Sequence, residues 1–121
     1  MQKVSSSFAN GVVPYSVLVG KIILGRRKSL AMDQTQLATA LGLSQSAYSR
    51  LESGDSIFSV SQLRTAAQVL QCSPNQILGE ADKLEKRLTA EGVKVISEKP
   101  ADKTSAMIGL GLLIALLAAG S

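Results

Sequence analysis

The stretch from Asp33 to Gly54, DQTQLATALGLSQSAYSRLESG, constrains the fold of this chain more than any other part of the sequence. Its apolar residues recur at the spacing of an amphipathic helix, and the pattern is interrupted once, at Gly42. The stretch therefore predicts two short helices that meet at a tight turn.

Capping residues mark the ends of both helices independently of the periodicity. Asp33 is a good N-cap acceptor and Gln36 follows three residues later, so the pair has the form of a capping box. Gly42 can adopt the left-handed conformation that ends the first helix. Ser44 is placed to cap the second helix, which we expect at residues 45–52. Two helices joined by a turn of about three residues that contains glycine are typical of a DNA-binding helix-turn-helix.

The segment resembles the Cro and lambda-repressor type of helix-turn-helix regulator, called the XRE family. The resemblance covers residues 17–78, and the matching residues are Gln34, Leu37, Ala38, Leu41, Gly42, Ser44, Ser49, Arg50, Leu51, Glu52 and Gly54, with Arg27 before them and Leu63, Ala66 and Leu70 after them. It implies an all-α fold with a five-helix, lambda-repressor-like DNA-binding domain, which we place at residues 14–79. It also implies a sequence-specific transcriptional regulator.

The other helices of this domain follow from the same periodicity. Pro14 fits the first turn of the first helix, and Ser59 caps a fourth helix that runs to about residue 71. A short fifth helix begins at Pro74. Residues 1–13 are rich in serine and show no period, so we expect a flexible N-terminal arm.

Residues 80–121 differ in composition and form a predicted C-terminal helical extension. Leu84 and Leu88 lie four residues apart in a sixth amphipathic helix, and residues 93–96 favour a short strand. After a polar linker we expect an apolar helix at residues 104–120.

This tail leaves two interpretations open. Residues 106–120 carry no charged or polar side chain, and their fifteen residues correspond to about 22 Å of helix, whereas a bilayer core is about 30 Å thick. Such an apolar surface is covered either by other copies of the chain or by lipid. We expect an oligomerisation region, and we keep a membrane anchor as the alternative.

The predicted recognition helix has an outward face, because Ala47, Tyr48 and Leu51 face inward by their spacing. We expect contacts to DNA bases in the major groove from Ser44, Gln45, Ser46, Ser49 and Arg50. The Gln45 amide can bond adenine N6 and N7, and the Arg50 guanidinium can bond guanine O6 and N7.

Other side chains are expected to hold the DNA backbone or the fold itself. We expect backbone contacts from four residues: Arg26, Lys28, Gln34 and Ser56. The role of Gln34 is implied by the resemblance. The resemblance also implies an intramolecular ion pair between Arg27 and Glu52, which is not a DNA contact.

The composition limits the classes of function. The 121 residues have a formal net charge of +4 and a pI of about 9.5, which suits double-stranded DNA as a partner. With no histidine and one cysteine, Cys72, the chain lacks the side chains for His-dependent catalysis, His-bearing metal sites or an intramolecular disulfide. We therefore expect no enzyme activity, no cofactor, no bound metal and a cytoplasmic location.

Two functions of different class remain. The leading one is a regulator that binds an inverted-repeat operator as a homodimer or tetramer joined through the C-terminal region. The alternative is a helix-turn-helix scaffold anchored in a membrane by its apolar tail. Gln45, Arg50 and the basic residues 26–28 favour DNA, whereas the uncharged tail favours the membrane.

Overall fold

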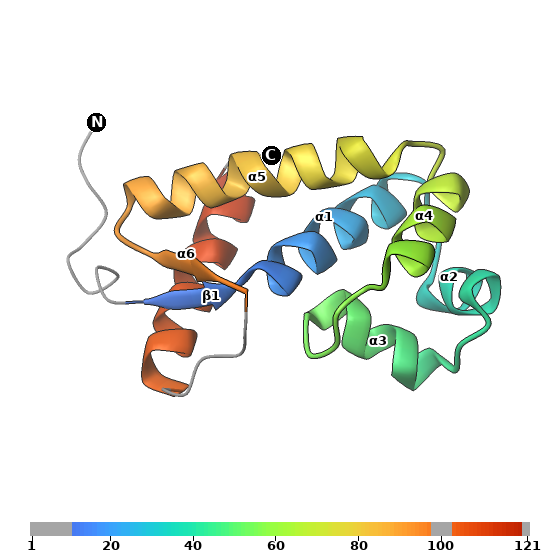
Figure 1. Cartoon of the computed structure of the whole chain (residues 1–121), viewed down its shortest axis with the longest axis horizontal. Coiled ribbons are helices and arrows are strands. Elements are labelled where there is room, and N and C mark those ends of the chain that lie inside the picture. The colour runs from blue at the N-terminus through green and yellow to red at the C-terminus, as the bar shows by residue number, and fades with distance from the viewer. Residues whose placement is uncertain (1–10, 98–102, 120–121) are drawn as a thin grey trace. The chain divides into compact units, whose positions relative to one another are not determined.

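The computed structural model describes residues 11–97 and 103–119 (Figure 1). Within these ranges the elements are β1 (Val12–Pro14), α1 (Tyr15–Ser29), α2 (Gln34–Leu41), α3 (Gln45–Ser53), α4 (Val60–Val69), α5 (Pro74–Ala90), β2 (Lys94–Ile96) and α6 (Lys103–Ala119). The fold is mainly helical, which confirms the predicted class. The described residues form two compact units, Ser16–Asp82 and the segments on either side of it, and the division falls within α5.

The local signals for α2, α3 and α4 are confirmed. The Asp33 carboxylate accepts a hydrogen bond from the Gln36 backbone N–H at 3.0 Å, and the Gln36 side chain accepts one from the Asp33 N–H at 2.9 Å. Gly42 ends α2 with a φ of 71°. Ser44 and Ser59 cap α3 and α4 through their hydroxyl groups. Each cap satisfies backbone groups that have no partner inside the helix.

The core of the Ser16–Asp82 unit is built from side chains that these helices turn inward. Leu18, Ile23, Leu37, Tyr48 and Ala66 are all fully buried. They come from four different helices, so this core fixes α2 and α3 against α1 and α4.

One prediction about the helices is wrong. We expected a short fifth helix and a separate sixth helix after Gly79, but α5 runs through that glycine as a single helix of 17 residues. Its buried stripe of Ile77, Ala81, Leu84 and Leu88 keeps helical spacing across the expected break. A glycine inside a helix costs only about 1 kcal/mol, so this continuous apolar stripe outweighs it.

The second unit contains a small parallel sheet. Val12 pairs with Lys94, Val13 with Val95 and Pro14 with Ile96, so β1 and β2 lie side by side (Figure 1). The predicted strand near residues 93–96 is confirmed. Residues 12 and 13 were expected in a flexible arm, and Pro14 in a helix, but all three form β1. The cause is pairing with a strand that is distant in sequence. Residues 1–10 of the predicted arm lie outside the described residues.

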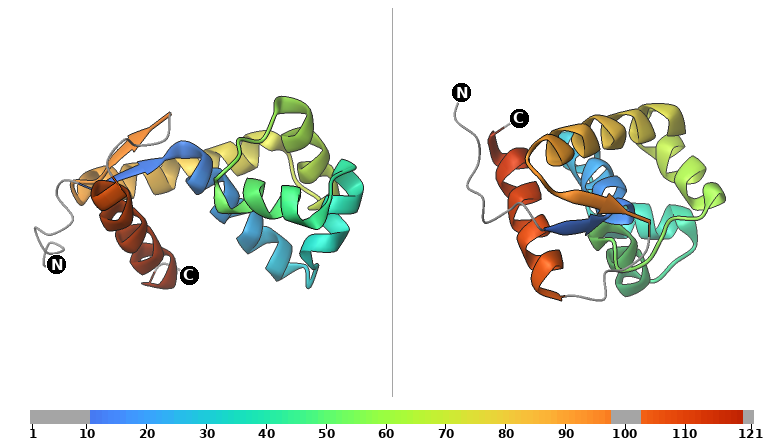
Figure 2. Two further views of the ribbon diagram at one scale, coloured as in Figure 1. Left: turned by 90° about the horizontal axis from the view of Figure 1, so that it is seen from below. Right: turned by 60° about the vertical axis from the view of Figure 1, so that its left-hand side comes forward.

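Helix α6 lies against β1 (Figure 2), and the closest approach is at Gly109. A Cβ added to Gly109 would lie 2.2 Å from the Val12 carbonyl oxygen, so only glycine allows the two backbones to approach this closely. The Arg87 guanidinium of α5 donates a hydrogen bond of 3.1 Å to the Leu116 carbonyl, one of the last four carbonyls, which have no partner within the helix. Among the described residues, no helix is both long enough and apolar enough to cross a membrane.

Candidate nucleic-acid interface

Helix α3 presents a polar surface on the side away from the core. Tyr48, Leu51 and Glu52 are buried on its inner side. Of the predicted base-contacting residues, Ser44, Gln45, Ser46 and Arg50 are exposed and Ser49 is half-buried. The fold therefore brings all five together on or beside one helix, with Ser44, Gln45 and Ser46 at its N-terminal end and Arg50 in its last turn.

The Ser44 hydroxyl has a structural task as well. It accepts a hydrogen bond of 3.1 Å from the Ala47 N–H and lies 3.3 Å from the Ser46 hydroxyl. A cap of this kind fixes the first turn of α3. Ser44 is therefore both the first residue of the outward face and the N-cap of α3.

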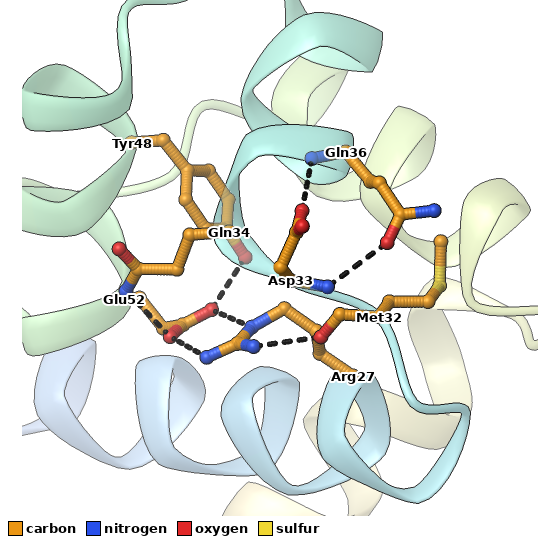
Figure 3. A network of polar contacts seen from close by, with 7 residues as sticks. All are labelled: Arg27, Met32, Asp33, Gln34, Gln36, Tyr48 and Glu52. Atoms are coloured by element: carbon orange, nitrogen blue, oxygen red, sulfur yellow. Dashed lines mark hydrogen bonds and ion pairs between the residues drawn. The ribbon is translucent and has the colours of Figure 1, made fainter.

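A buried ion pair holds the other end of α3 (Figure 3). Arg27 Nε donates to Glu52 Oε2 at 2.9 Å, and Arg27 Nη2 donates to Glu52 Oε1 at 2.8 Å. Arg27 Nη1 donates to the Met32 carbonyl at 2.8 Å. The two residues are 7% and 3% exposed. This bidentate geometry joins α1 to α3 and also secures the chain that leads into α2.

Two further groups complete the network around Glu52. Gln34 Nε2 donates to Glu52 Oε1 at 3.0 Å, and the Tyr48 hydroxyl donates to Oε2 at 2.7 Å (Figure 3). Gln34, which we expected at the DNA backbone, thus directs its amide nitrogen to Glu52. We assigned Tyr48 only to the core, although its spacing of four residues from Glu52 signals a contact on one helix face.

The network determines the charge state of its members. Burial alone raises the pKa of the Glu52 carboxyl, but hydrogen bonds from Arg27, Gln34 and Tyr48 outweigh burial, so its pKa lies below the ordinary value. Burial, followed by the hydrogen bond to Glu52, raises the pKa of the Tyr48 hydroxyl. The hydrogen bond to Glu52 raises the pKa of the Arg27 guanidinium. The pair is therefore charged, and Tyr48 is a neutral donor, at neutral pH.

Close backbone contacts add to this support. A Cβ added to Gly20 of α1 would lie 2.2 Å from the Glu52 carbonyl oxygen, and one added to Gly54 would lie 2.5 Å from the Val17 side chain. The Ser16 hydroxyl donates to the Gly54 carbonyl at 3.0 Å. The lack of a side chain at Gly20 thus allows α1 to touch the end of α3.

The residues predicted to contact phosphates differ in their surroundings. Lys28 is exposed at the end of α1, and Ser56 is half-buried in the loop after α3, with its N–H bonded to the Arg50 carbonyl at 3.0 Å. Arg26 instead forms an ion pair with Glu80 of α5, a partner that local sequence patterns did not indicate. In the same loop, the Phe58 ring meets the Tyr48 ring edge to face, with centroids 6.5 Å apart.

Comparison with known proteins agrees with this geometry. Residues 24–77 match a family model described as helix-turn-helix. This segment is therefore a helix-turn-helix domain, and the resemblance to the XRE family is confirmed for it.

The chain is also 42% identical, over 69 residues, to the HTH-type transcriptional regulator DicA of Escherichia coli (strain K12). The match covers 56% of this chain and 51% of DicA, so it spans about half the length of that relative. No solved structure matches the chain significantly.

Proposed function

We propose that this chain is a sequence-specific DNA-binding transcriptional regulator. One observation carries the proposal: α3 has an exposed polar face near its N-terminus and a buried Arg27–Glu52 network at its C-terminal end. Because this network fixes α3, the helix can enter the major groove without any change in the contacts that hold it in the domain. The match of residues 24–77 to the helix-turn-helix family and the similarity to DicA support the same function.

In this proposal the side chains on α3 read the base edges. The exposed Gln45 and Arg50 offer the planar amide and guanidinium groups that make paired hydrogen bonds to adenine and guanine, respectively. Ser44, Ser46 and Ser49 are short groups that can accept or donate. Gln45 and Arg50 therefore supply most of the sequence preference.

Contacts to the DNA backbone orient the domain. We assign this role first to Lys28, whose ammonium is exposed at the end of α1, and to Ser56 in the loop after α3. Arg26 contributes less, because its ion pair with Glu80 must loosen before it reaches a phosphate. Gln34 acts mainly through Glu52 and so supports α3 from within.

We also propose that the regulator acts as a dimer or higher oligomer on an inverted repeat. A single helix-turn-helix meets one half-site, and successive half-sites are about 34 Å apart. Joining two domains makes binding of the second half-site intramolecular, which raises affinity without any new DNA contact. We assign the joining contacts to the region after α5.

Selection of DNA sequences from a random pool by the purified full-length protein tests this function. We expect enrichment of one motif with two related half-sites in opposite orientation. Affinity for the enriched motif should exceed that for a scrambled duplex by at least about a thousandfold at physiological salt. Equal affinity for both duplexes, with no enriched motif, contradicts the proposal.

A further inference from the structure

One face of helix α6 packs against the other elements of its own unit. Leu112 and Leu113 are 1% and 0% exposed, and Gly109 is also buried. Gly109 lies against the backbone of Val12, as the close Cβ approach shows. This inner face accounts for the attachment of α6 to its own unit. Because Gly109 is already in contact with Val12, it is not available for contact with another molecule.

The opposite face of α6 is apolar and uncovered. Met107, Leu110 and Ile114 are 73%, 38% and 54% exposed. Small residues lie exposed on the same side of the helix. We define the outer face of α6 by six residues, Met107, Leu110, Gly111, Ile114, Ala115 and Ala118. None of the six carries a charge, and large apolar side chains gathered on one face mark a binding surface more often than scattered ones do.

The order of large and small residues on the outer face is the decisive feature. An antiparallel two-fold axis placed opposite the bond between Leu112 and Leu113 relates position 107 to 118, 110 to 115, and 114 to 111. In such a pair, Met107 faces Ala118, Leu110 faces Ala115 and Ile114 faces Gly111. Every large side chain then meets a small one, so the face is complementary in shape to itself.

A parallel pair lacks this complementarity. There each residue faces its own copy, so Met107 meets Met107 and Gly111 meets Gly111. Bulky contacts then alternate with gaps, and close packing fails at both. Opposed helix dipoles also favour the antiparallel arrangement.

We propose that the outer face of α6 binds the same face of a second copy of this chain in an antiparallel pair. This deepens the proposed function, on which it rests for its biological purpose, by naming the surface that joins two subunits. A helix of 17 residues is about 25 Å long, and a strip about 10 Å wide along it buries about 500 Å² in total. Stable interfaces bury about 1,200–2,000 Å², so the pair is weak and self-association in solution needs a high protein concentration. One DNA that holds both copies strengthens it.

Charge substitutions at facing positions test both the surface and its orientation. Met107→Lys and Ala118→Glu are made separately in the full-length protein, and self-association is measured by sedimentation equilibrium in the absence of DNA. Each variant alone should associate at least tenfold more weakly than the parent protein. An equimolar mixture should form a one-to-one heterodimer with near-parental strength, because the new ammonium of one chain faces the new carboxylate of the other.

Two controls separate this result from general effects of charge or folding. Thr89→Lys, at an exposed position of α5 outside the outer face, should associate like the parent. Far-ultraviolet circular dichroism of all variants should match the parent, because the substituted positions are exposed. A variant that loses helical signal is replaced by the milder Met107→Gln or Ala118→Gln, which should weaken association several-fold.

Three results overturn the proposal: a parent protein that stays monomeric at all concentrations, a mixture no stronger than either variant alone, or flotation of the parent with phosphatidylcholine vesicles that Met107→Lys abolishes. The last result assigns the outer face to lipid. The association measurement uses no DNA, so its failure is distinct from failure of the selection experiment. A chain that pairs through α6 but enriches no DNA motif refutes only the proposed function.

Discussion

The guanidinium of Arg27 and the carboxylate of Glu52 meet through two hydrogen bonds of 2.9 and 2.8 Å in the interior of the helix-turn-helix unit. This pair connects α1 to the C-terminal end of α3, the helix that carries the polar outer surface. Its loss therefore affects stability and the position of α3 together.

The first prediction concerns the stability of this pair. Glu52→Gln should lower the free energy of unfolding by about 3 kcal/mol, because Arg27 remains buried as an uncompensated charge. The double variant Arg27→Met with Glu52→Leu should lose less than the single one, since no charge is left inside. Urea unfolding measures both. As the control, Glu80→Gln removes the more exposed ion pair with Arg26 and should cost less than about 1 kcal/mol. Equal midpoints for Glu52→Gln and the parent contradict the prediction.

The second prediction is a dependence on pH. The folded-state pKa of Glu52 is lowered, so its contribution to stability is fully present above the unfolded value of about 4.3 and is lost as pH falls through the folded value. Urea unfolding of the parent between pH 7 and pH 3 should show a steeper loss below about pH 4.3 than that of Glu52→Gln. Parallel curves throughout this range show that Glu52 does not titrate in this way.

The third prediction concerns the chain between α1 and α2. Ala31 has a φ of 55°, in the left-handed region, and its N–H bonds to the Lys28 carbonyl at 3.0 Å. Glycine adopts this conformation without steric cost, so Ala31→Gly should raise the free energy of unfolding by about 0.5–1 kcal/mol. The same change at the exposed helical position Ala40 should lower it by up to about 1 kcal/mol. Thermal or urea unfolding should therefore show that the same substitution of alanine by glycine stabilises the protein at position 31 and destabilises it at position 40.

The fourth prediction separates readout of bases from attraction to phosphates. Gln45→Ala and Arg50→Ala should each cost about 1–3 kcal/mol on the enriched site and relax the preference at one base pair. Lys28→Ala should weaken binding to all sequences alike and reduce the salt slope by about one, whereas Arg26→Ala should reduce it less because of its pair with Glu80. Fluorescence anisotropy at several salt concentrations measures both quantities. If all four variants lose affinity equally for every DNA sequence, the assignment of base contacts and phosphate contacts is wrong.

Sequence reasoning succeeded where the signals are local. The caps at Asp33, Ser44 and Ser59 involve residues within three positions of each other, so the N-terminal ends of α2, α3 and α4 are visible in the sequence. It failed at β1, where the partner is distant. The strand at Val12 depends on β2, and nothing near it in the sequence indicates that pairing.

Gly79 shows a different kind of failure. Glycine is a common helix terminator, but the apolar stripe of α5 continues on both sides of it, and tertiary packing decides the outcome. The candidate site also combines local and distant signals. Outward positions on α3 follow from helical spacing, whereas the ion pair of Arg26 with Glu80 brings together side chains separated by most of the domain and carries no local signal.

The pairing of β1 with β2 has a consequence for the order in which the molecule assembles. The whole Ser16–Asp82 unit separates these strands in sequence, so on the ribosome β1 emerges long before its partner exists. The helices of that unit make contacts between near neighbours in the chain and can fold while synthesis continues. The segment that carries α6 follows that unit in the chain, so a nascent chain acquires the proposed surface for reading DNA before the proposed surface that joins it to a second copy.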